Sequence, residues 1–190
     1  MFYFAAMSPY SWFSAERIER VLPDARWIPV TAAFIFKAAG RTPWGLTEER
    51  EQGMADCERR MREHGLGDMS WPEPWPTSDI PVARAMTYAD SIGMLRPYAL
   101  SAMRLAFKEG ANLELIETLL QAARSCGIDG EQLAAGIEDP AVKEQLREST
   151  DEASALGVFG VPTVVVAGAL FWGDDRLDEA ARAHATRAGA

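Results

Sequence analysis

The first forty residues alternate between short apolar runs and one amphipathic stretch. Residues 1–4 form an apolar, strand-like run, and residues 14–21 carry apolar side chains at helical spacing with charged side chains between them. Residues 27–30 form a second short strand-like run, and residues 31–39 continue as an apolar segment before Gly40. This pattern predicts a strand, a helix and a second strand.

The middle of the chain has a helical periodicity. It predicts successive helices at residues 47–64, 82–92, 97–109, 112–126, 130–137 and 140–156. Between the first two of these, residues 70–81 contain the sequence Trp71-Pro72-Glu73-Pro74-Trp75-Pro76, whose prolines exclude regular structure. Such a loop could be a linker or a peptide-binding surface, but we expect it to line a pocket or to cover an edge of the core.

The last part of the chain returns to strand patterns. Residues 163–166 are β-branched, Gly168 marks a turn, residues 169–172 form another strand pattern, and residues 174–186 have the pattern of a closing helix. The order strand–helix–strand, helical block, strand–strand–helix predicts an α/β fold. We expect a discontinuous sheet domain, residues 1–40 with 157–190, interrupted by an all-helical insertion domain, residues 41–156.

Charge and composition narrow the range of partners. The net charge is −9, and the arginines alternate with acidic residues, as in Cys57-Glu58-Arg59-Arg60, which is typical of a solvated helix face. We therefore expect no binding to nucleic acid. The apolar runs are shorter than a bilayer span and the N-terminus lacks a basic segment, so we expect no membrane association and a cytoplasmic location. Two cysteines and two histidines give little material for a disulfide framework or a metal site.

Candidate chemistry begins where the first strand meets the first helix, at Ser8-Pro9-Tyr10-Ser11. In thioredoxin-like redox proteins, two cysteines separated by two residues occupy this junction. Here both sulfur positions hold hydroxyl groups, and disulfide exchange needs a thiolate. A serine at a helix N-terminus can instead donate a hydrogen bond to the thiolate of a ligand, and the helix dipole favours the same negative charge.

Two further motifs lie near the end of the chain. Val161-Pro162 precedes a strand, and a cis bond there would expose the backbone N–H and C=O groups of Val161 to a peptide-like ligand. The alternative is an ordinary proline at a strand edge. Asp174 and Asp175 precede the last helix, where a carboxylate can cap the helix or bind an α-ammonium group. Both roles stay open for this pair.

Together these motifs resemble a known family. The segments Ser8-Pro9-Tyr10-Ser11-Trp12, Gly157-Val158-Phe159-Gly160-Val161-Pro162 and Phe171-Trp172-Gly173-Asp174-Asp175-Arg176-Leu177 resemble those of 2-hydroxychromene-2-carboxylate isomerases and kappa-class glutathione transferases, which belong to the DsbA-like superfamily. The resemblance spans nearly the whole chain and includes the length and position of the helical insertion. It implies a thioredoxin-like sheet domain.

The resemblance also implies roles for individual residues. Ser8 matches the serine that activates the sulfur of glutathione, and the other expected glutathione contacts are Val161, Pro162, Trp172, Gly173, Asp174 and Asp175. Lys37 matches a lysine that faces the ligand in the isomerases. The expected pocket for the second substrate comprises Lys37, Arg41, Thr42, Tyr10, Trp75 and Ser78. The chain departs from the family pattern at Ala5, at Arg41-Thr42 and at Ser78, so the identity of the second substrate is not implied.

The function expected from this resemblance is a glutathione-dependent isomerase. The glutathione thiolate, stabilised by Ser8, adds reversibly to a conjugated aromatic acid. A kappa-like glutathione transferase or peroxidase is the nearest alternative. A DsbA-like thiol–disulfide oxidoreductase is disfavoured because cysteine is absent at positions 8 and 11. A thiol- or peptide-binding module without catalysis is the remaining alternative. Relatives suggest a homodimer, and no metal is expected.

Overall fold

The computed structural model describes residues 1–188 and confirms the predicted order of elements. Along the chain the elements are β1 (Phe2–Phe4), α1 (Pro9–Val21), β2 (Trp27–Pro29), α2 (Ala32–Ala38), α3 (Arg50–Glu63), α4 (Ile80–Ser91), α5 (Leu95–Glu109), α6 (Ile116–Cys126), α7 (Gly130–Glu138), α8 (Pro140–Ala155), β3 (Thr163–Val166), β4 (Ala169–Trp172) and α9 (Leu177–Ala188). Short 3₁₀ turns occupy Trp44–Leu46 and Asp174–Arg176.

The four strands form one mixed sheet in the order β2-β1-β3-β4. β1 pairs in parallel with β2, and Phe2 lies opposite Trp27. β3 runs antiparallel to both β1 and β4. The parallel pair needs a crossover, which α1 supplies, whereas β3 and β4 are joined by a tight turn at Ala167 and Gly168, both with positive φ. This arrangement is thioredoxin-like, as the sequence predicted.

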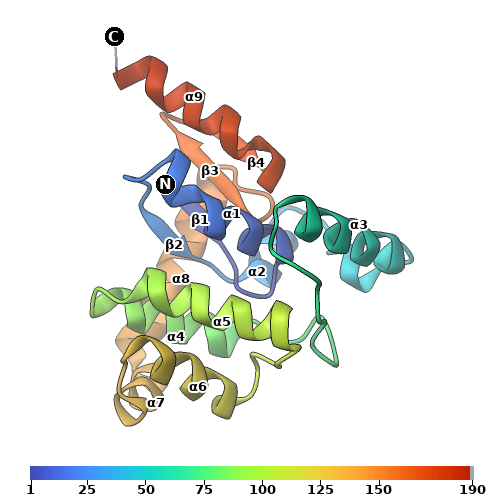
Figure 1. The fold of residues 1–190 in the computed structure, drawn as a ribbon. Helices are drawn as coiled ribbons and strands as arrows, with labels where there is room; N and C mark the ends of the chain where they lie inside the picture. Colours follow the sequence, from blue (N-terminus) through green and yellow to red (C-terminus); the bar gives the residue numbers. More distant parts are fainter. Residues whose placement is uncertain (189–190) are drawn as a thin grey trace.

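Successive side chains of β1 point to opposite faces of the sheet, and each face has its own helices. Phe2 and Phe4 belong to the larger core cluster, which includes residues of α1 and α9. Tyr3 belongs to a smaller cluster with Ile35 of α2 and Ala153 of α8. In Figure 1, α1 and α9 accordingly lie on the near side of the strands and α8 on the far side. The sheet is therefore covered on both faces.

The helices α4 to α7 pack together beside the sheet, at the bottom of Figure 1. The larger core cluster extends from Phe4 and Trp27 of the sheet to Phe107 on α5 and Leu133 on α7. The helical residues and the sheet thus share buried apolar surface. The division into two domains at residues 40 and 157 stays a prediction.

Several predicted boundaries shift by a few residues, and two of the shifts have a clear local cause. The helix predicted to begin at residue 112 begins at Ile116, because the side chain of Asn112 accepts the N–H of Glu114 and forms a turn there. The closing helix begins at Leu177 because Asp174–Arg176 is a 3₁₀ turn. The apolar residues 31–39, to which no element was assigned, form the short helix α2.

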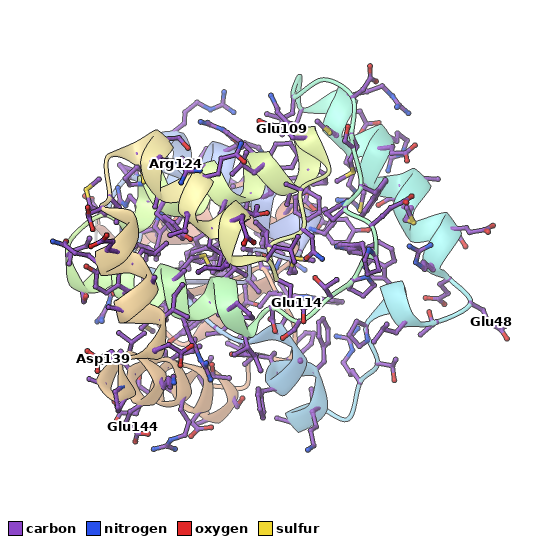
Figure 2. The ribbon with its side chains drawn as sticks, turned by 90° about the horizontal axis from the view of Figure 1, so that it is seen from below. Glu48, Glu109, Glu114, Arg124, Asp139 and Glu144 are labelled. Atoms are coloured by element: carbon purple, nitrogen blue, oxygen red, sulfur yellow. The ribbon has the colours of Figure 1, made fainter. Side chains whose placement is uncertain are left out.

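Many charged side chains lie at the periphery. Figure 2 shows Glu48, Asp139 and Glu144 at the outer edges of the molecule, and all three are exposed. Within residues 1–188, no helix combines the length and the apolar character needed to cross a bilayer.

Candidate functional site

A cavity of about 920 Å³ opens where the start of α1 meets α2 and the loops around them. Its wall includes Ser8, Val161, Pro162, Trp172, Gly173, Asp174 and Asp175, which are all the predicted glutathione contacts. It also includes Tyr10, Arg41, Thr42, Trp75 and Ser78 from the predicted pocket for the second substrate. The fold therefore brings segments from both ends and the middle of the chain to one place.

Lys37 is the one predicted site residue that does not line this cavity. The helix α2 presents Ala32, Ala33 and Phe36 to the cavity, whereas Lys37 is exposed. The next position along a helix is rotated by about 100°, so Phe36 occupies the place that the prediction gave to the lysine. Lys37 therefore lies outside the described cavity wall, and its assignment to the second-substrate pocket stays a prediction.

Ser8 is the N-cap residue of α1. Its backbone is extended, with φ −99° and ψ 115°, and its Oγ accepts the N–H of Ser11 at 3.2 Å. Pro9 follows at the first helical position, where its missing N–H removes no helical hydrogen bond. The side chain is only partly buried, and no described residue accepts its O–H hydrogen. The hydroxyl is thus oriented by the helix and can donate to a ligand in the cavity.

Ser11 has a different role from Ser8. It is fully buried, and its Oγ accepts the N–H of Ala5 at 3.3 Å. This bond joins the first turn of α1 to the end of the strand segment. Ser11 therefore stabilises the junction that positions Ser8.

The Val161–Pro162 peptide bond is cis. Among the described residues, neither the N–H nor the C=O of Val161 forms a hydrogen bond, although this residue lines the cavity. The carbonyl of Pro162 accepts the N–H of Gly173 at 2.9 Å, which ties this loop to the Trp172–Asp175 segment. The free N–H and C=O of Val161 are therefore available to a partner in the cavity.

Asp174 is a buried ion-pair residue, not a helix cap. It is 2% exposed, its Oδ1 accepts Arg60 Nη1 at 2.8 Å, and its Oδ2 lies 3.2 Å from His64 Nε2. No described backbone N–H donates to the carboxylate of either Asp174 or Asp175. The capping role considered for these aspartates is therefore wrong, while Asp175 remains exposed at the cavity wall.

Arg60 connects this carboxylate to α3, which corrects the interpretation of its helix face. Arg59 is exposed and pairs with Asp56 and Glu63, as expected for a solvated face. Arg60 instead reaches both Asp56 and Asp174 and lies over the ring of Tyr10. Neighbouring arginines on a helix point in directions about 100° apart, so only one of them can turn inward. Sequence reasoning missed both Arg60 and His64 because no local signal marks their distant partner.

Tyr10 and Cys57 lie beneath this ion-pair network. Tyr10 Oη donates to Asp56 Oδ2 at 3.2 Å, and burial raises the pKa of Tyr10 above its usual value. Burial also raises the pKa of the Cys57 thiol to about 12, and it raises that of Cys126. Neither cysteine therefore forms a thiolate readily at neutral pH.

The Pro- and Trp-rich loop forms both part of the core and one wall of the cavity. Trp75 is buried, and its Nε1 donates to the carbonyl of Met7 at 3.3 Å, directly before Ser8. Its ring contacts Trp44 and Trp71 at centroid distances of 5.0 Å and 4.6 Å. The predicted pocket and core roles of this loop are both confirmed, and the loop also holds the turn that carries Ser8.

Arg41 stacks on aromatic rings at the cavity wall. Its guanidinium carbon lies 4.5 Å from the ring centre of Trp172 and 5.4 Å from that of Phe159. Trp172 and Phe159 are themselves in edge contact, at 4.9 Å. Arg41 has no acidic partner among the described residues, so the edges of its guanidinium group remain free to bind an anion.

Asp79 is a further cavity residue that the sequence did not reveal. It is 5% exposed, and its Oδ2 accepts the N–H of Ala32, at the start of α2, at 2.6 Å. Its position before Ile80 and Pro81 resembles that of an ordinary helix cap, yet it does not cap α4. Among residues 1–188, no cluster of three His, Cys, Asp or Glu side chains is arranged to hold a metal ion.

The chain is similar to known proteins over most of its length. A model of the DSBA-like thioredoxin domain family matches residues 1–185. Human glutathione S-transferase kappa 1 is 26% identical over 195 aligned residues, covering 93% of this chain and 86% of the transferase. The 2-hydroxychromene-2-carboxylate isomerase of Sphingobium xenophagum is 26% identical over 186 aligned residues, covering 93% of each chain.

A solved structure gives the same result for the fold. The structure of a 2-hydroxychromene-2-carboxylate isomerase has a TM-score of 0.83 to this chain, covers 99% of it and 96% of its own length, and is 22% identical in sequence. The family resemblance and the thioredoxin-like fold expected from the sequence are therefore confirmed. A sequence identity of 26% is too low to assign the reaction of either relative to this chain.

Proposed function

The chain belongs to the DSBA-like thioredoxin domain family, and from this premise we propose that it is a glutathione-dependent isomerase. The observation that carries the proposal is the hydroxyl of Ser8, oriented at the start of α1 and open to the cavity. An ordinary thiol has a pKa of about 8.5, so only a few per cent is thiolate at pH 7. A donor and a helix N-terminus together lower that pKa and enrich the nucleophile.

Ser8 suits this task because its two hydrogen-bonding capacities are separated. Its oxygen accepts the N–H of Ser11, which fixes the rotation of the side chain, and its hydrogen remains to donate to a sulfur. The first turn of α1 contains no acidic residue, so no fixed charge there opposes a thiolate. In this proposal Ser8 stabilises the thiolate and forms no covalent bond itself.

The remaining glutathione contacts follow from the free polar groups of the wall. The unpaired N–H and C=O of Val161 suit the backbone of the cysteinyl residue, in the manner of an added β-strand. Both oxygens of Asp174 already contact side chains, so we assign the α-ammonium group of the γ-glutamyl end to Asp175. Gly173 has a φ of 108°, a conformation that a side chain would strain, and it carries the chain past Pro162 into this segment.

The second substrate is proposed to be a conjugated aromatic acid. The thiolate adds to its double bond, a single bond then rotates, and the thiolate leaves as the double bond forms again. Tyr10, Trp44 and Trp75 offer aromatic surface along the wall, and Arg41 offers a cation for the acid group. Thr42 and Ser78 are the other polar side chains that we assign to this part.

A glutathione transferase or peroxidase is the second candidate function. The similarity to human glutathione S-transferase kappa 1 supports it, since the identity equals that to the isomerase. In a transferase the thiolate would stay attached to its electrophile, so product analysis with glutathione distinguishes the two. A dithiol oxidoreductase is disfavoured because Ser8 and Ser11 replace the thiols, and Cys57 is buried with a raised pKa. A binding module without catalysis would bind glutathione but turn over no substrate.

Calorimetry with glutathione tests the proposal. We expect wild-type protein to bind glutathione with the thiolate form favoured, so that thiolate absorbance of the complex rises at a lower pH than that of free glutathione. Replacing Ser8 by Ala removes a hydrogen bond to a charged group, worth about 1.5–3 kcal/mol, and should raise the pKa of the bound thiol by about one to two units. Ser8→Thr, which keeps a hydroxyl, is the matched control.

Two outcomes would reject the proposal. If millimolar glutathione fails to bind, the glutathione site is wrong, and a screen of other low-molecular-weight thiols becomes the next test. If glutathione binds equally well as thiolate to Ser8→Ala, Ser8 is not the activating group. The homodimer and the cytoplasmic location implied by the resemblance stay predictions; light scattering of the purified chain tests the first and fractionation of cells the second.

A further inference from the structure

Asp79 is a buried carboxylate in the cavity wall without a charged partner. Its side chain sits where the loop ending at Ser78 meets the first turn of α2. Oδ2 accepts the N–H of Ala32 at 2.6 Å, whereas Oδ1 has no hydrogen-bond partner among the described residues. Every side-chain oxygen of the described residues that is fully inaccessible to solvent has a hydrogen-bond partner. Because Oδ1 of Asp79 has none, it must belong to the 5% of the residue that is exposed. Asp79 lines the cavity, so a ligand there lies within reach of its side chain.

The charged groups around Asp79 do not neutralise it. No ion pair joins it to a charged residue of α2, α4 or α8, and of the other charged residues lining the cavity, Arg60 and Arg176 have acidic partners of their own. The charged residues of these helices are Lys37 on α2, Arg84 and Asp90 on α4, and Lys143, Glu144, Arg147, Glu148, Asp151 and Glu152 on α8. The other charged residues that line the cavity are Arg41, Glu49, Arg60, Asp174, Asp175 and Arg176. Burying a carboxylate without a charged partner costs free energy, so such a group in a cavity wall is a candidate functional residue.

The environment also sets the protonation of this group. Burial raises the pKa of Asp79 to about 6, although backbone N–H groups of Ala32 and Ala33 act in the opposite direction. A group that is half protonated near the working pH can both give and accept a proton, which is the condition for efficient acid–base catalysis.

We propose that Asp79 is the proton donor and acceptor for the substrate in this cavity, acting through its unpartnered Oδ1. The proposal rests on the function proposed above, since it assigns to that reaction a residue that supplies and removes a proton. It also limits the substrate class to conjugated acids whose double bond is next to a carbonyl group.

Thiolate addition produces an enolate, and a proton donor in the cavity can protonate it at carbon. When the thiolate attacks, the sulfur–carbon bond forms and the electron pair of the double bond moves onto the carbonyl as an enolate. The protonated carboxyl of Asp79 then gives its proton to the carbon next to the carbonyl. On the return path the carboxylate of Asp79 removes a proton from that carbon, the double bond forms again, and the carbon–sulfur bond breaks. No oxidant or reductant is needed.

A purely structural role for Asp79 can be separated from this one. Its Oδ2 satisfies the N–H of Ala32, and an asparagine oxygen at the same position can accept the same bond. Asp79→Asn therefore keeps the helix contact and removes the proton. Glu48→Gln is the matched control, since Glu48 is an exposed carboxylate that does not line the described cavity.

The test uses glutathione and benzylidenepyruvate, an aromatic conjugated keto acid, in deuterated water. Reversible addition exchanges deuterium into the carbon next to the ketone, and mass spectrometry measures the exchange above the rate without protein. We expect Asp79→Asn to slow this exchange by about 10²-fold, with glutathione affinity unchanged, and Glu48→Gln to leave it unaltered. The wild-type rate should change through one ionisation near pH 6, matching the carboxyl titration of Asp79 by NMR, and Asp79→Asn should lack this change.

The outcomes separate the two proposals. Exchange at the wild-type rate in Asp79→Asn, or an Asp79 carboxyl that titrates near the ordinary value of about 3.9, overturns the role of Asp79 while the glutathione reaction stands. Failure of glutathione to bind, or exchange unaffected by Ser8→Ala, overturns the proposed function and with it this role.

Discussion

Two carboxylates are buried in the wall of the cavity, and their surroundings differ completely. Asp174, 2% exposed, lies between Arg60 and His64. Asp79, 5% exposed, accepts the N–H of Ala32, and its other oxygen has no hydrogen-bond partner among the described residues. A buried charge with ionic partners ties structural elements together, whereas one without them costs free energy and tends to become neutral. The comparison indicates that Asp174 fixes the shape of the cavity and that Asp79 is available to a ligand.

The partners of Asp174 explain its structural role. Through Arg60 it connects the 3₁₀ turn after β4 to α3, and Arg60 also lies over Tyr10, two residues after Ser8. Arg17 of α1 donates to the backbone carbonyl of Asp174 at 3.3 Å. Three elements that border the cavity therefore meet at one ion-pair network.

Breaking the paired carboxylate should have the largest effect. Arg60→Gln leaves Asp174 buried with only His64 beside it, and we expect the free energy of unfolding to fall by about 3 kcal/mol. Urea denaturation followed by circular dichroism measures the change. Arg59→Gln is the control, because Arg59 forms only exposed pairs on α3 and should change stability by less than about 1 kcal/mol. Equal effects of the two substitutions would show that Asp174 does not depend on Arg60.

Replacing the unpaired carboxylate of Asp79 by an amide should change the free energy of unfolding by less, and in the opposite direction. The pKa of Asp79 is about 6 in the folded protein, against about 3.9 in an unfolded chain. Because the folded protein holds the proton of Asp79 more tightly than the unfolded chain does, the free energy of unfolding falls as the pH rises from about 4 through about 6. Asp79→Asn removes this loss and should raise the free energy of unfolding by about 2–3 kcal/mol at pH 8.

The pH dependence provides the check. Urea denaturation of Asp79→Asn and wild type at a series of pH values should give stabilities that agree near pH 4, diverge between about pH 4 and 6, and stay apart above pH 6. Glu48→Gln should follow the wild type throughout. A destabilised Asp79→Asn at pH 8 would mean that the carboxylate is needed ionised at the start of α2, and the contrast with Asp174 would disappear.

The smallest predicted effect concerns Arg41, the cavity cation stacked on Trp172. Arg41→Gln should weaken the binding of an anionic ligand about fivefold, or about 1 kcal/mol, because the side chain is exposed. Arg41→Lys should recover part of this loss, since it restores the charge but not the planar stacking. Calorimetry with benzylidenepyruvate, and with glutathione against its glycyl ethyl ester, shows which carboxylate Arg41 binds. Unchanged affinity for all three ligands would contradict an anion-binding role.

Much of the fold follows from local sequence signals. The strands predicted at residues 163–166 and 169–172 have those bounds in the structure, and the first helix begins after Ser8 as its serine and proline indicate. Such features depend on residues a few positions apart, through side-chain periodicity, turns and caps. Departures arise where a side chain forms an unexpected turn, as Asn112 does before α6.

The ion pairs and hydrogen bonds of the cavity wall depend on the tertiary structure. Arg60 is 114 positions from Asp174 in the sequence, and Asp79 is 47 positions from Ala32. Only the packing of the helices and the loops decided which arginine turns inward, why Phe36 and not Lys37 lines the cavity, and which buried carboxylate has no charged partner among the described residues. The sequence by itself determined the order of the elements and the serine at the helix start, because both depend on neighbours along the chain. The protonation and pairing of buried groups depend on neighbours in space, and these exist only once the chain has folded.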